Sequence, residues 1–195
     1  MKKLSKQLAL IVTLIGILSL TNCITSFPYT VTNNFDDEFL GENEDRNIGL
    51  VDNFLYWKNG SQLNPYIDLK KDGTITSTGF FLANIRVDLD WLNIRRGDKI
   101  VFLADGKRIS AKAIAGSIDS EVWSSTYGAR KIYYDYATYI LTKQQMNLIC
   151  NASNLKVKVY GRTGRDEYGS DEKQPLNPSF YANNKRFFAE NLLGK

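Results

Sequence analysis

Between residues 48 and 141 the chain gathers β-branched, aromatic and alternating apolar residues into short runs, as β-strands do. Two-residue turn signals separate several of these runs: Asn59-Gly60, Asp72-Gly73 and Asp105-Gly106. Such pairs adopt the positive φ angles of tight hairpin turns at little cost. The pattern therefore predicts antiparallel hairpins, and the clearest of them spans residues 99–114.

Two helices are predicted nearer the C-terminus. Thr142 and Gln145 have the spacing of a capping box, which predicts a helix that ends near Asn151. Its apolar face would consist of Met146, Ile149 and Cys150. Asn177 and Pro178 have the features of a cap residue and a first-turn proline, and predict a last helix with an apolar stripe formed by Phe180, Phe187, Phe188 and Leu192.

Between the two helices, residues 155–160 alternate apolar with polar positions and predict a half-buried strand. Residues 161–174 are polar and glycine-containing, and we expect them to form a solvated loop. No repeat or proline-rich hinge divides residues 47–195, which predicts a single domain. The expected fold is mainly β, of the α+β kind: an antiparallel β-sandwich or an open barrel, with one internal helix and a C-terminal helix.

The first residues follow another pattern. Lys2, Lys3 and Lys6 precede an apolar run of 13 residues, Leu8 to Leu20. A bilayer-spanning helix needs about 20 residues, so this run has the length of a signal-peptide core instead. An uncleaved anchor helix and an ordinary secretory signal are the alternatives.

The sequence Leu20-Thr21-Asn22-Cys23 follows directly and resembles the lipobox of bacterial lipoproteins, of the spirochaete type because Asn22 replaces the usual Gly or Ala. The resemblance covers residues 1–23. It implies that residues 1–22 are a cleaved signal peptide and that the Cys23 thiol carries diacylglycerol. Ile24 replaces the aspartate that retains many lipoproteins at the inner membrane, so the resemblance favours anchoring at the outer membrane of the cell envelope.

Removal of the signal peptide changes the charge. The whole chain has 25 basic and 21 acidic residues, but cleavage removes three lysines and leaves a net charge of about +1. This near-neutral value predicts no nucleic-acid partner. Residues 23–46 carry most of their charge as carboxylates, and we expect them to form an acidic tether between the membrane and the domain.

The composition also limits the chemistry. Without histidine there is no Ser-His-Asp triad, Cys-His dyad or histidine-ligated metal, and no Asp-x-Asp-x-Asp-Gly loop is present. With Cys23 lipidated, Cys150 has no disulfide partner and is expected to be a small buried residue. We therefore expect no enzymatic activity, no cofactor and no metal.

Two groups of residues are candidate binding sites. Arg96-Gly97-Asp98 matches the tripeptide of integrin ligands, but it also suits a turn that leads into a strand, which we favour. The second group is rich in tyrosine: Tyr133, Tyr134, Tyr136 and Tyr139. On one strand, Tyr134 and Tyr136 would share a face and Tyr133 and Tyr139 would share the other. Exposed, they would suit a protein or a sugar; the alternative, which we favour, is that they pack within the fold.

The sequence thus predicts a lipid-anchored module that acts by binding. The working hypothesis is a surface adhesin for matrix or plasma proteins of a host. The alternative is a structural or assembly subunit of the envelope with an internal protein partner. A histidine-free hydrolase is a third reading, and it would require partly buried carboxylates clustered in a cleft.

Overall fold

The computed structural model describes residues 29–32, 46–56, 60–70, 72–87, 91–125, 128–169 and 175–193. Within these residues, ten strands form one antiparallel sheet in the order β1-β2-β4-β5-β8-β7-β6-β9-β10, with β3 paired to β4. The strands are β1 (Tyr29–Thr32), β2 (Arg46–Leu50), β3 (Phe54–Tyr56), β4 (Ser61–Leu69), β5 (Ile75–Val87), β6 (Lys99–Ala104), β7 (Lys107–Ser125), β8 (Gly128–Ile140), β9 (Leu155–Tyr160) and β10 (Arg165–Tyr168). The helices are α2 (Lys143–Cys150) and α3 (Pro178–Asn191).

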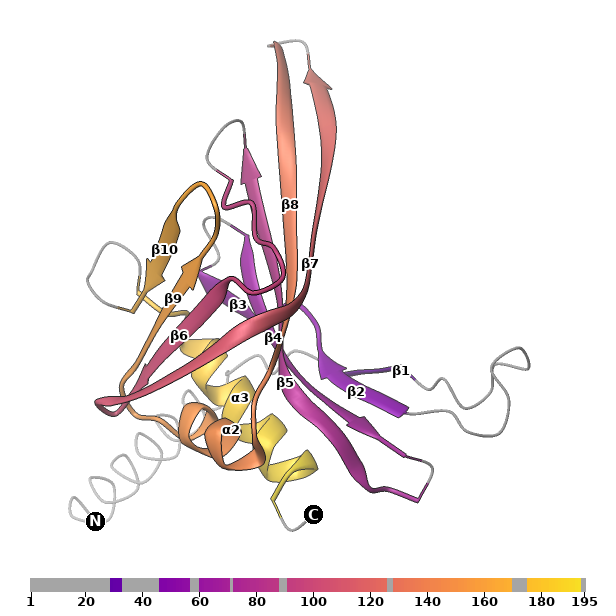
Figure 1. The fold of residues 1–195 in the computed structure, drawn as a ribbon, viewed down its shortest axis with the longest axis vertical. Coiled ribbons are helices and arrows are strands. Elements are labelled where there is room, and N and C mark those ends of the chain that lie inside the picture. The colour runs from indigo at the N-terminus through magenta and orange to yellow at the C-terminus, as the bar shows by residue number, and fades with distance from the viewer. Residues whose placement is uncertain are drawn as a thin grey trace, which may run out of the picture.

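The sheet is strongly curved because β7 belongs to two sections of it (Figure 1). The beginning of β7 pairs with β6, and the rest pairs with β8 after an irregularity between Ala113 and Ala115. The long section consists of β1 to β5, β8 and the later part of β7. The short section consists of the start of β7 with β6, β9 and β10. At the bend, a Cβ on Gly116 would lie 2.9 Å from the Ile94 carbonyl oxygen, so glycine lets the segment before β6 cross β7 closely.

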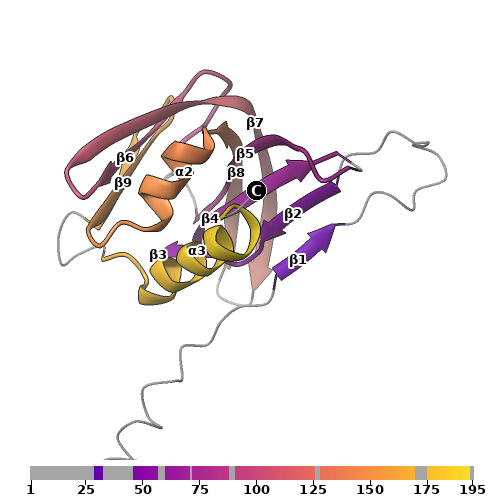
Figure 2. The ribbon, with the colours of Figure 1, turned by 90° about the horizontal axis from the view of Figure 1, so that it is seen from below.

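Both helices lie on the concave side of the sheet (Figure 2). Helix α2 packs against β5 and β6, while α3 packs against β3 and β4. The core therefore fills the space between the two sections and includes Phe80 and Phe102, whose ring centroids are 5.5 Å apart. The open antiparallel sheet with an internal and a C-terminal helix confirms the predicted fold class.

Several local predictions are confirmed. Asp105 and Gly106 have φ angles of 47° and 80°, as the predicted β6–β7 turn requires. The capping box of Thr142 and Gln145 is present, and α2 buries the expected apolar face. Cys150 is a free, buried cysteine, and its burial raises the pKa of the thiol, which keeps it protonated and unreactive.

Two segments differ from the prediction. Residues 161–174 are not a loop throughout, because Arg165–Tyr168 forms β10 and pairs with β9. Residues 23–46 are not only a tether, because Tyr29–Thr32 forms β1 and pairs with β2, so the expected boundary at residue 46 lies within the sheet. In β10 the inward positions are filled by the half-buried Asp166 and the buried Tyr168. Because both side chains are polar, the sequence did not show the alternation of apolar and polar residues that is typical of a strand.

Candidate functional site

The convex face of the long section contains an open groove of about 720 Å³. Residues of β2, β4, β5, β7 and β8 line it, so it crosses much of the section. Four large apolar side chains are exposed there: Val51 (41%), Phe81 (38%), Ile114 (46%) and Ile140 (47%). Apolar side chains gathered on one face, with polar groups around them, are typical of a surface that contacts a partner.

The charged residues that line the groove, among those the structure describes, are all acidic. They are Asp52 and Asp68, with neither lysine nor arginine. Asp68 accepts a hydrogen bond from Asn47 Nδ2 at 2.6 Å, and Asp52 accepts one from Gln62 Nε2 at 3.1 Å. The groove therefore combines an apolar floor with acidic groups that neighbouring amides hold in place.

Two of the predicted tyrosines extend this surface along β8. Tyr134 and Tyr136 lie half-buried on the same face, with ring centroids 6.3 Å apart. The Tyr136 ring also stacks on Phe81 of the groove at 5.9 Å. The Tyr134 hydroxyl donates to Glu121, and this hydrogen bond raises the pKa of the tyrosine. The three rings form a stacked row that continues the apolar floor, and we call it the aromatic row.

The other two candidate tyrosines are placed differently. Tyr139 is fully buried in the core, so its ring cannot contact a partner, and its inclusion as a binding residue was wrong. Tyr133 lies on the opposite face of β8 from the aromatic row, where it stacks on Trp91 at 4.9 Å beneath Lys131. Tyr133 and Tyr139 thus pack within the fold, as the favoured alternative in the sequence analysis predicted.

Arg96, Gly97 and Asp98 form a turn that leads into β6. Gly97 has a φ of +91°, and its N–H donates to the Ala113 carbonyl at 2.8 Å. The Asp98 carboxylate accepts from the Arg95 N–H at 2.9 Å and pairs with Arg162 Nε at 3.2 Å. Its side chain is only 14% exposed, so these contacts occupy the group that an integrin-bound metal ion would need.

We therefore expect Asp98→Ala to lower the free energy of unfolding by about 1 kcal/mol, because the Arg95 N–H loses its acceptor. Cell attachment should be unaffected by Asp98→Glu. Urea denaturation and an attachment assay measure the two effects, with Arg96→Ala, at an exposed position, as the stability control. Loss of attachment in Asp98→Glu would instead support an integrin-binding role.

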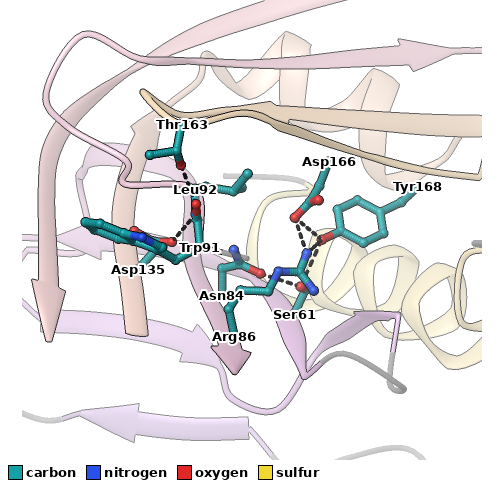
Figure 3. Close-up of polar contacts among 9 residues, drawn as sticks. All are labelled: Ser61, Asn84, Arg86, Trp91, Leu92, Asp135, Thr163, Asp166 and Tyr168. Carbon is teal, nitrogen blue, oxygen red and sulfur yellow. Dashed lines mark hydrogen bonds and ion pairs between the residues drawn. The ribbon is translucent and has the colours of Figure 1, made fainter. Parts of the chain in front are cut away.

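A buried polar cluster, which the sequence did not predict, joins the two sections (Figure 3). Arg86 of β5 pairs with Asp166 of β10 and donates to the Tyr168 hydroxyl at 3.2 Å. Tyr168 in turn donates to Ser61 Oγ of β4 at 2.8 Å. The Ser61 hydroxyl donates to Asn84 Oδ1 at 2.6 Å. These groups are largely enclosed by protein, which suits a structural tie between β10 and the long section.

Asp135 of β8 forms a second buried polar contact nearby (Figure 3). It is fully buried, and its carboxylate accepts from the N–H groups of Leu92 at 3.0 Å and Ile94 at 3.1 Å. Burial raises the pKa of this carboxyl group, although the two backbone hydrogen bonds oppose the shift. Asp135 thereby holds in place residues 92–94, the segment before β6 that crosses β7 at Gly116.

Two predicted features, Cys23 and the signal peptide of residues 1–22, lie outside the described residues. No helix in the described part of the chain combines the length and apolar character needed to cross a bilayer. Comparison of the chain with protein families, with curated proteins and with solved structures found no match.

Proposed function

We propose that the protein is a lipid-anchored binding module of a bacterial envelope, and that its groove holds a matrix or plasma protein of a host. The observation that carries the proposal is the exposed apolar floor of the groove together with the aromatic row. Tyrosine and other aromatic side chains supply much of the binding energy of protein interfaces, since they bury large areas at a small entropic cost. The lipobox of Cys23 supports the anchor.

The chemistry of the groove indicates the kind of segment that would fit. Apolar side chains of the partner would cover Phe81, Ile114 and Ile140. Asp52 and Asp68 favour a segment that also carries lysine or arginine, since no cation among the described lining residues would repel one. The partner is therefore expected to present an apolar stretch flanked by basic residues.

Cells that produce the Phe81→Ser/Ile140→Ser double variant should attach to immobilised matrix or plasma proteins at least about tenfold less well than wild-type cells. The basis is that truncation of an interface anchor typically costs about 2 kcal/mol. Leu193→Ser, at a position that is 67% exposed at the end of α3, is the matched control and should attach normally.

Two further measurements make this test decisive. Protease added to whole cells should remove the protein, and Cys23→Ala should abolish its labelling with fatty acid. Protection from protease would favour an internal envelope subunit, while unchanged attachment of the double variant would exclude the groove as the binding surface.

A further inference from the structure

The outer face of the short section is strongly basic. Alternation along its strands places six cations on this face: Lys99, Arg108, Lys112, Lys156, Lys158 and Arg165. The same registers place one acidic residue, Glu167, on this face, where it pairs with Lys158. The near-neutral net charge, from which the sequence analysis predicted no nucleic-acid partner, therefore conceals a local concentration of positive charge on this face.

The cations are arranged in rows by the register of the strands. Leu103 of β6 lies between Arg108 of β7 and Lys156 of β9. Lys99 lies directly opposite Lys112. Adjacent strands are about 4.8 Å apart and side chains of one face repeat about every 6.8 Å, so neighbouring charges are close. Like charges opposite each other destabilise a sheet, and a bound anion would remove this cost.

A shallow hollow of about 230 Å³ lies among these cations. Its lining includes Arg108, Lys156 and Lys158 together with Leu103, Tyr160 and Glu167, and Glu167 is paired with Lys158. Leu103 is 38% exposed, and Tyr160 is half-buried. Cations beside an apolar and an aromatic surface match the two sides of an acidic sugar, whose sulfate or carboxylate groups are anionic and whose ring C–H face is apolar.

We propose that this face binds an anionic polysaccharide, a chain with sulfate or carboxylate groups on successive sugars. The rows of cations suit a linear chain with regularly spaced charges, and the hollow suits one sugar ring. A membrane surface is a poorer match. The short section lies at the opposite end of the strand order from β1, which is the described strand nearest to Cys23 in the sequence.

The test measures binding of the full-length protein to immobilised heparin, a defined sulfated polysaccharide. Arg108→Gln/Lys156→Gln removes the two cations that flank Leu103, and we expect it to weaken binding at least tenfold. The control is Arg130→Gln/Lys185→Gln, which removes the same charge from exposed positions on β8 and α3 and should bind as the wild type does. Binding should also weaken as salt is added, because salt screens the contacts.

Three results would overturn the proposal. One is equal weakening by both double variants, which would indicate non-specific attraction. Another is binding to anionic lipid vesicles as tight as to heparin, which would indicate a membrane-facing surface. The third is equally tight binding to a single-stranded oligonucleotide, which would indicate a site for any polyanion. The groove variant Phe81→Ser/Ile140→Ser should retain heparin binding, so this proposal and the proposed function fail separately.

Discussion

Arg86→Met is expected to lower the free energy of unfolding by about 3–5 kcal/mol, the usual cost of removing one partner of a buried ion pair. The side chains of Arg86 and Asp166 are only 9% and 18% exposed. Without the guanidinium, the Asp166 carboxylate would remain in a largely enclosed site without its cation. The Tyr168 hydroxyl would also lose a donor.

Urea denaturation of the purified protein measures this effect. Lys158→Met is the matched control, since Lys158 and Glu167 also join β9 to β10 but have side chains 30% and 39% exposed. Exposed pairs contribute about 0–1 kcal/mol, so the control should unfold almost as the wild type does. If Arg86→Met cost no more than this control, the buried cluster would not be the tie between β10 and the long section.

The same cluster shows what the sequence could not reveal. Turns and helix caps depend on neighbouring residues, and so Asp105-Gly106 and the Thr142 capping box were predicted correctly. Strand β10 was missed because its inward residues are polar and have partners about 80 residues or more away in the chain, at Arg86 and Ser61. A buried Asp or Tyr with so distant a partner has the local pattern of a solvated loop.

Prediction of the candidate binding surfaces from the sequence was limited in the same way. The period of two correctly placed Tyr134 and Tyr136 on one face of β8. It could not identify which face was buried, and so Tyr139 was included wrongly. The groove and the basic face each combine residues of several strands, and the order of strands in the sheet is not encoded in any single segment. Net charge likewise reports a sum and not its distribution over a surface.

Asp135→Ala should also destabilise the fold strongly. The substitution leaves the N–H groups of Leu92 and Ile94 buried without their acceptor, at a cost of about 1–3 kcal/mol each. Asp135→Asn keeps one acceptor oxygen and should cost roughly half as much. Urea denaturation at neutral pH measures both variants, and an equal loss in the two would contradict the two-donor arrangement.

The pH dependence provides a second check on Asp135. Because burial raises the pKa of this carboxyl group, the folded protein binds its proton at a higher pH than the unfolded chain does. As the pH falls from neutrality through this raised pKa towards the ordinary value of 3.8, the group adds stability to the wild type. Asp135→Asn lacks this gain, so the stability difference between wild type and variant should widen on acidification. A constant or shrinking difference would mean that the charged carboxylate, bound by its two N–H donors, is the preferred form in the folded protein.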